Sequence, residues 1–123
     1  MGYVPRGTTS EAEEQVKVMA WADLMSNKHQ CLKWLYHTPN GGSRNIAEAA
    51  NLKRMGVKAG VPDLCLPYPS NGFHGLYTEM KKDGGRLTAA QRDYIEWLNE
   101  NGYRAVVCYG TEHAIKVLEY YLR

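Results

Sequence analysis

Two apolar segments joined by a short turn, at residues 61–68 and 75–82, place the strongest constraint on how this chain folds. They read VPDLCLPY and GLYTEMKK, and both are rich in residues that favour β-strands. The residues between them include Pro69-Ser70-Asn71-Gly72, a combination typical of a tight turn. The pattern therefore predicts a β-hairpin.

Helices and further strands are predicted on both sides of the hairpin. Ser10, with Glu13 three residues later, has the capping-box pattern, so a helix is expected to begin there and to run to about Met25. This helix is apolar on two sides, as expected for burial in a layered fold or at a subunit contact. Helices are also predicted at 46–55, 88–102 and 111–122, and strands at 32–38 and 103–109. The order predicts an α/β fold with a small mixed β-sheet flanked by helices.

Length and composition favour a single globular domain. The chain has 123 residues, of which 44% are apolar, and this suits one domain at 9–123 preceded by a flexible arm at 1–8. No apolar run is long enough to cross a bilayer, and the first residues lack the pattern of a secretion signal, so a cytoplasmic protein is expected. Three widely spaced cysteines form no CxxC pair, which argues against a zinc site or a disulfide framework.

The net charge of +2 is too small to indicate a nucleic-acid partner by itself. The positions of the basic residues are more informative, because they gather in two segments of the chain. The first group is Lys53, Arg54 and Lys58, and the second is Lys81, Lys82, Arg86 and Arg92.

Two carboxylates and a lysine are expected to meet on the hairpin. Side chains alternate along a strand, so Glu79 and Lys81 emerge on the same face, and Asp63 on the paired strand can lie beside Glu79. Two carboxylates this close repel each other unless a divalent cation lies between them. Magnesium suits such a site, because it is commonly bound by one or two carboxylates together with substrate phosphates.

The same residues also permit a simpler interpretation. A Glu-x-Lys sequence on a strand is common, and it usually forms only a solvated face. The Pro62-Asp63 sequence before an apolar strand favours the catalytic interpretation, in which Lys81 orients the attacking water, helps to deprotonate it or neutralises charge on a phosphate.

Several motifs in a fixed order carry a resemblance to a known family. They are Gly60-Val61-Pro62-Asp63-Leu64, Glu79-Met80-Lys81 and Leu87-Thr88-Ala89-Ala90-Gln91, with Pro39-Asn40-Gly41-Gly42 upstream and Gly102-Tyr103-Arg104-Ala105-Val106-Val107 downstream. In this order the sequence resembles the VRR-NUC family of the PD-(D/E)XK nuclease superfamily, in its stand-alone, phage-type form. The resemblance covers about residues 9–122 and implies a restriction-endonuclease-like core. The Val-Arg-Arg sequence that names the family is absent.

The resemblance implies roles for the residues of the hairpin and of the neighbouring helices. It makes Asp63 and Glu79 the metal ligands, with the backbone carbonyl of Met80 as a third, and Lys81 the catalytic lysine. It places Gln91 in the site, although Thr88-x-x-Gln91 is also a capping box that explains the glutamine without catalysis. An acidic residue from the first helix is expected too; Glu14 is the first choice and Glu11 the second.

A wider set of residues is predicted to contact DNA. His37 and Asn40 belong to a segment that the family places near the site, although a lone histidine in a strand is more often simply packed or hydrogen-bonded. The basic residues predicted to meet phosphates are Lys53, Arg54, Lys58, Lys82 and Arg86. A solvated helix end would explain Lys53, Arg54 and Lys58 equally well.

Together these features predict a Mg²⁺- or Mn²⁺-dependent, structure-selective DNA endonuclease. The resemblance to stand-alone forms implies a Holliday (four-way) junction resolvase that acts as a homodimer in a bacterial cell or a phage-infected host, with no membrane and no nucleotide cofactor. Trp97, Tyr120 and Tyr121 are candidates for a dimer interface. Two alternatives remain: a nuclease of the same fold that cuts flaps, ends or duplex, and a catalytically inactive DNA-binding module.

Overall fold

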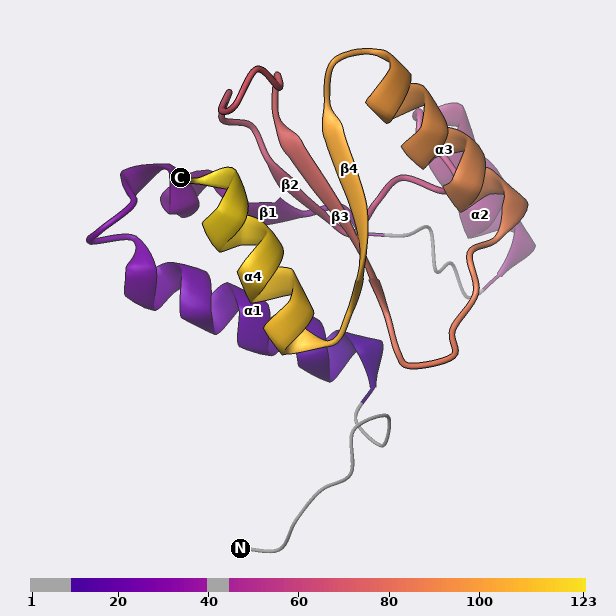
Figure 1. Ribbon diagram of the computed structural model, residues 1–123. Coiled ribbons are helices and arrows are strands. Elements are labelled where there is room, and N and C mark those ends of the chain that lie inside the picture. Colours follow the sequence, from indigo (N-terminus) through magenta and orange to yellow (C-terminus); the bar gives the residue numbers. More distant parts are fainter. Residues whose placement is uncertain (1–9, 40–44) are drawn as a thin grey trace, which may run out of the picture.

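A four-stranded mixed β-sheet forms the centre of the computed structural model, which describes residues 10–39 and 45–123 (Figure 1). The strands lie in chain order: β1 (Tyr36–His37), β2 (Leu64–Leu66), β3 (Leu76–Lys81) and β4 (Arg104–Tyr109). The β1–β2 and β2–β3 pairs are antiparallel, and β4 runs parallel to β3. The predicted hairpin is therefore β2–β3, and the predicted α/β class with a small mixed sheet is confirmed.

Helices cover both faces of this sheet. Figure 1 shows α1 (Glu11–Met25) and α4 (Thr111–Tyr121) side by side on one face, and α3 (Ala89–Glu100) on the other. The helix α2 (Ile46–Arg54) lies on the α3 side and has no buried residue. The hydrophobic core fills the space between the sheet and the α1–α4 pair; its members include Val18, Ala22, Leu32, Leu64, Leu66, Leu76, Met80, Cys108, Ala114 and Leu118.

The predicted helix starts follow from local side-chain chemistry. Ser10 and Glu13 form a complete capping box at α1, and Thr88 and Gln91 form another at α3. Each box satisfies backbone N–H groups that the first turn of a helix leaves without a partner. The end of α2 also agrees with the prediction, because Gly56 follows it with a φ of +106°.

The predicted strand at 32–38 is wrong over most of its length. A 3₁₀-helix, η1 (Gln30–Trp34), occupies its first part, and only the two-residue strand β1 follows. The reason lies in the spacing of Leu32 and Leu35, which are both buried. A strand would turn residues three apart to opposite faces, whereas a 3₁₀ turn stacks them on one side.

The first strand of the hairpin is also shorter than the predicted 61–68, because β2 spans only Leu64–Leu66. Proline lacks the N–H that a strand donates to its neighbour, and Pro62 and Pro67 flank β2 closely. As a result, Asp63 lies just outside the regular strand.

The two apolar sides of α1 have different surroundings. Val18 and Ala22 are buried against the core, whereas Val16 and Leu24 are 67% and 74% exposed. Cys65 and Cys108 are buried free thiols. Within residues 10–39 and 45–123, none of the helices is long and apolar enough to span a membrane.

Candidate active site

Two buried carboxylates meet where the β2–β3 hairpin opens. Leu64 pairs with Thr78 across the antiparallel strands, so the next position outward places Asp63 opposite Glu79. The Asp63 Oδ2 atom accepts a hydrogen bond from the backbone N–H of Met80 at 2.7 Å. Asp63 is only 8% exposed and Glu79 only 2%. The structure therefore brings together the two residues that the sequence proposed as a pair.

The Glu79 carboxylate is held in an environment that disfavours its charge. Burial, and then the adjacent Asp63 carboxylate, raise the pKa of Glu79 from its usual 4.5 to about 8. Its Oε1 atom is buried and has no hydrogen-bond partner among the described residues. A buried acceptor without a partner destabilises a fold unless another group binds it.

A divalent cation fits this arrangement. It would neutralise the repulsion between Asp63 and Glu79 and would satisfy the unpaired Glu79 oxygen. Within the described part of the chain, no group of three or more His, Cys, Asp or Glu side chains is arranged to hold a metal. The pair thus suits Mg²⁺, which is often held by one or two carboxylates with substrate oxygens completing its shell, better than Zn²⁺. A contribution from the Met80 carbonyl stays a prediction.

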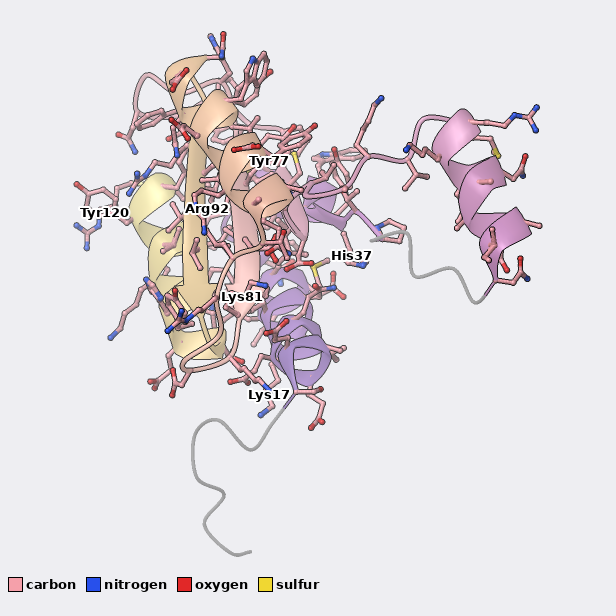
Figure 2. All side chains as sticks on the ribbon, turned by 90° about the vertical axis from the view of Figure 1, so that its right-hand side faces the viewer. Lys17, His37, Tyr77, Lys81, Arg92 and Tyr120 are labelled. Atoms are coloured by element: carbon pink, nitrogen blue, oxygen red, sulfur yellow. The ribbon has the colours of Figure 1, made fainter. Side chains whose placement is uncertain are left out.

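Lys81 lies next to the carboxylate pair, at the last position of β3 (Figure 2). It shares the face of the strand that Glu79 occupies, and its ammonium lowers the pKa of Glu79 against the stronger effect of burial. The side chain is half-buried, so one end of the site reaches solvent. The Lys81 ammonium therefore lies where it would meet a phosphate that approaches Asp63 and Glu79.

The acidic residue of α1 nearest to this pair is Glu11, not the first-choice Glu14. The Glu11 carboxylate adds to the raised pKa of Glu79, and its Oε2 atom accepts a hydrogen bond from the Lys82 backbone N–H at 3.2 Å. Glu14 instead accepts a 2.7 Å hydrogen bond from the Thr111 hydroxyl and lies 3.8 Å from Lys17. The geometry therefore favours Glu11 for a role in the site.

Gln91 makes both of the contacts that the sequence offered as alternatives. Its Oε1 atom accepts a hydrogen bond from the Thr88 N–H at 2.9 Å, which completes the cap of α3. This leaves the amide nitrogen to face the site, where it donates to the Glu79 Oε2 atom at 3.4 Å. One side chain thus fixes the start of α3 and links it to the carboxylate pair.

His37 is joined to the backbone of the same segment. Its Nδ1 atom lies 2.8 Å from the Asp63 carbonyl oxygen, which also accepts a hydrogen bond from the Thr38 N–H at 2.9 Å. Because a carbonyl can only accept, Nδ1 carries the proton in this contact, and Nε2 is left to other partners on an exposed side chain. His37 therefore anchors the segment that presents Asp63. Asn40 lies outside the described residues.

The predicted basic contacts fall into two places. Lys53 and Lys58 line a groove of about 530 Å³ that runs between α2 and the start of α3 and reaches Gln91. Lys82 and Arg86 are exposed on the loop after β3, and Arg54 is exposed near the end of α2. All five remain predicted phosphate contacts.

Two features of the site had little or no signal in the sequence. Thr111, which holds Glu14, lies 97 residues from it along the chain. Gly60 has a φ of +86°, and a Cβ atom there would lie 2.3 Å from the Ala90 carbonyl oxygen in α3. The close approach fixes the loop before Asp63 against the same turn of α3 that carries Gln91. The only sequence signal was the glycine in the motif.

The raised pKa of Glu79 predicts how stability depends on pH when no divalent cation is present. Between about pH 5 and pH 8 the folded chain keeps a proton on Glu79 that the unfolded chain releases, so stability falls as pH rises through this window. We expect the Tm measured in EDTA to decline over this range, and Glu79→Gln to flatten the decline. Glu96→Gln, at an exposed position on α3, is the matched control. Equal declines in wild type and Glu79→Gln would contradict the assignment.

The chain is similar to known proteins in sequence and in structure. The sequence model of the VRR-NUC domain family matches residues 8–112. A solved structure described as a VRR_NUC domain protein is 39% identical in sequence and superposes with a TM-score of 0.77, covering 93% of this chain and 88% of that one. No curated protein matches the sequence significantly.

Proposed function

Because this chain belongs to the VRR-NUC family, whose domain is of the nuclease type, we propose that it is a divalent-metal-dependent endonuclease that hydrolyses phosphodiester bonds in DNA. The observation that carries the proposal is the buried Asp63–Glu79 pair, with the unpartnered Glu79 Oε1 atom and Lys81 beside it. Paired carboxylates next to a lysine are a chemical arrangement suited to binding both a cation and a phosphate.

Asp63 and Glu79 are the residues that would hold Mg²⁺ or Mn²⁺, with the Met80 carbonyl as the proposed third ligand. When bound, the cation would neutralise negative charge on the scissile phosphate and activate water as the nucleophile. The Met80 N–H holds Asp63 in place, and the Gln91 amide does the same for Glu79. Both carboxylates are therefore oriented by hydrogen bonds before any substrate arrives.

Lys81 is proposed to act directly on the substrate. Its ammonium neutralises charge that builds on the phosphate oxygens in the transition state and orients the attacking water. Glu11, which reaches the edge of the same cluster, is proposed to complete it in place of Glu14. His37 presents its free Nε2 atom beside the Asp63 segment and is proposed to contact substrate there.

For the substrate, we propose a branched DNA, with the four-way junction as first choice and a homodimer as the active form. A twofold dimer presents two equivalent sites to two symmetric strands. The outer side of α1 supports self-association, because the exposed Val16, Ala20 and Leu24 repeat every four residues and form an uncovered apolar stripe. A nuclease that cuts flaps, ends or duplex would use the same carboxylates and lysine.

A substrate panel tests this proposal. Labelled four-way junction, flap, single-stranded and linear duplex DNA are incubated with protein in Mg²⁺, Mn²⁺ or EDTA, and the protein's mass is measured by light scattering. We expect symmetric cuts in the junction that need a cation, and a mass near twice 13.9 kDa. Cleavage of flaps or duplex alone would indicate a repair or restriction nuclease instead of a junction resolvase. A monomeric mass would contradict paired cutting of the two strands. Absence of any cleavage with either cation would contradict a nuclease.

A further inference from the structure

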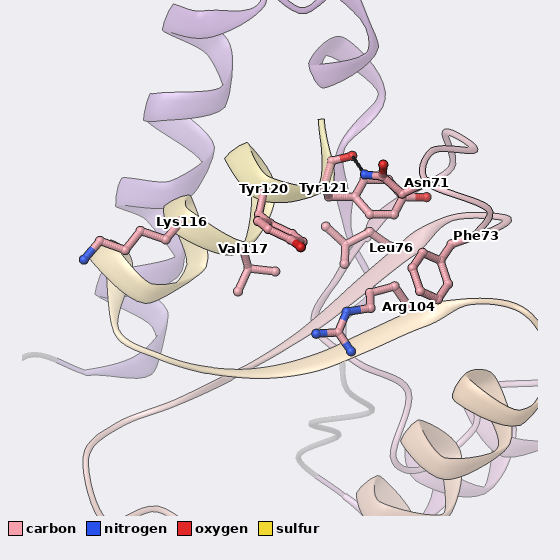
Figure 3. Close-up of a pocket in the computed structure, with 8 residues that line it drawn as sticks. All are labelled: Asn71, Phe73, Leu76, Arg104, Lys116, Val117, Tyr120 and Tyr121. Carbon is pink, nitrogen blue, oxygen red and sulfur yellow. Dashed lines mark hydrogen bonds between the residues drawn. The ribbon is translucent and has the colours of Figure 1, made fainter. Parts of the chain in front are cut away.

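A second pocket lies far from the carboxylates, between the C-terminal half of α4 and the start of β3 and β4 (Figure 3). Its volume is about 230 Å³, and its walls include Phe73, Leu76, Arg104, Lys116, Val117 and Tyr120. Leu76 pairs with Arg104 at one end of β3, and Lys81 stands at the other end, about 17 Å away at 3.3 Å per residue. Leu76 and Glu79 also point to opposite faces of the sheet. This pocket is therefore separate from the candidate active site.

Hydrogen bonds between Tyr121 and the residues around the β2–β3 turn hold the rim of the pocket in place. The carbonyl oxygen of Tyr121 accepts hydrogen bonds from the Ser70 hydroxyl at 2.6 Å and from the Asn71 side-chain amide at 3.0 Å. The Tyr121 hydroxyl donates to the Tyr68 carbonyl oxygen at 2.6 Å. These bonds fasten the β2–β3 turn to the end of α4, so the pocket is preformed and a ligand need not order it.

The lining combines aromatic rings with unpaired positive charge. Within the described residues, neither Arg104 nor Lys116 forms an ion pair, and the lining contains no carboxylate. Tyr120 is 66% exposed, and the Arg123 guanidinium carbon lies 5.2 Å from the centroid of its ring. Figure 3 shows the Arg104 side chain beneath Leu76, with Tyr120 to one side of it and Phe73 to the other. The pocket therefore suits a ligand that carries both a flat apolar ring and a negative charge.

We propose that this pocket binds one unpaired nucleotide of a DNA strand. The base would lie against Tyr120 and Phe73 above the apolar floor of Leu76, and the adjoining phosphate would meet Arg104 and Lys116. Aromatic stacking combined with a cationic rim is the usual way in which proteins hold single strands without reading their sequence. The volume is below that of a pocket for a drug-sized molecule, in keeping with a single base.

The choice of DNA among nucleotide-bearing ligands rests on the proposed function, but the site itself uses none of the catalytic residues. In Figure 2, His37 and Tyr120 lie on opposite sides of the molecule. A strand seated in the pocket would therefore belong to an arm of the substrate that leads away from the scissile phosphate. We infer that a branched substrate with an unpaired arm gains affinity from this surface, whereas a short blunt duplex does not.

Binding of a fluorescein-labelled ten-nucleotide oligo(dT), measured by anisotropy in EDTA, tests the proposal without cleavage. We expect Tyr120→Ala to weaken binding by about five- to a hundredfold, the range typical for loss of one stacking contact. Arg104→Gln is expected to weaken it by about tenfold or more, through loss of a charge-assisted contact to phosphate. Tyr120→Phe keeps the ring and is expected to bind within about twofold of wild type. Lys33→Gln removes one exposed charge outside the pocket and is the matched control. Far-UV circular dichroism verifies that each variant is folded.

The possible outcomes distinguish a failure of this inference from a failure of the proposed nuclease activity. Unchanged oligo(dT) binding in both Tyr120→Ala and Arg104→Gln would overturn it, as would tighter binding of an acidic tyrosine-containing peptide than of oligo(dT) by wild type. Tyr120→Ala is expected to cut a blunt substrate at the wild-type rate if wild type cuts it, because the pocket lies apart from Asp63 and Glu79. If wild type cuts no DNA but Tyr120→Ala still loses oligo(dT) binding, the pocket stands and only the nuclease proposal fails.

Discussion

Replacing Lys81 with alanine is expected to reduce DNA cleavage by about 10²- to 10³-fold, the usual loss when one preorganised charge-stabilising group is removed. Its ammonium lies beside Glu79, the least exposed acid of the site, where solvent screens charge poorly. The loss should appear in kcat more than in KM, because the interaction strengthens as charge develops on the phosphate. Single-turnover cleavage in Mg²⁺ measures it directly.

Two control variants test whether the loss of cleavage is specific to Lys81. Lys82→Ala removes an exposed neighbour whose predicted role is phosphate contact, so it should raise KM and leave kcat nearly unchanged. Lys33→Ala, on η1, should change neither. Cleavage by Lys81→Ala at the wild-type rate would show that this lysine has no part in the chemistry, whatever its position beside Glu79.

The largest loss of stability is expected from Gly60→Ala. Gly60 has a φ of +86°, and the added Cβ would lie 2.3 Å from the Ala90 carbonyl oxygen and 2.4 Å from its carbonyl carbon. These are backbone atoms of α3, so they cannot move aside without shifting the helix. Backbone strain and overpacking together predict a loss of about 2–5 kcal/mol in the free energy of unfolding. That corresponds to a fall in Tm of about 10 °C or more.

Gly84→Ala separates the two causes of this loss. Gly84 has a similar φ of +79°, but a Cβ there would meet nothing within 4 Å, so only the strain of about 1–2 kcal/mol applies. Urea unfolding of the two variants measures the difference. Gly60→Ala should also lose cleavage below its Tm, because the loop before Asp63 and the turn of α3 that carries Gln91 move apart. Equal stability of the two variants would contradict close packing at Gly60.

The parts of the fold that the sequence predicted correctly depend on neighbours along the chain. The capping boxes at Ser10 and Thr88 lie within one turn of helix, and the β2–β3 hairpin is closed by its own turn. Once that hairpin exists, the alternation of side chains fixes Asp63 opposite Glu79. The central pair of the candidate site was therefore predictable before any tertiary structure was known.

The features that the sequence left open or predicted wrongly depend on tertiary packing. Glu11 and Glu14 lie on one side of α1, and the packing of α1 against β3 and α4 places Glu11 by the carboxylates and Glu14 by Thr111. The 3₁₀ turn at Leu32 forms in place of a strand because it buries two leucines on one side, which outweighs the strand preference of Trp34 and Tyr36. Neither outcome is encoded in the neighbouring residues alone.

Binding of Mn²⁺ to the free protein, followed by isothermal titration calorimetry, tests the central claim that Asp63 and Glu79 form a cation site. At pH 8 we expect the wild type to bind Mn²⁺ in a saturable manner through this pair, and Glu79→Gln to lose that binding, while Glu96→Gln keeps it. Equal Mn²⁺ binding by the wild type and Glu79→Gln, or no binding by the wild type with and without DNA, would contradict the assignment of this pair as the metal site.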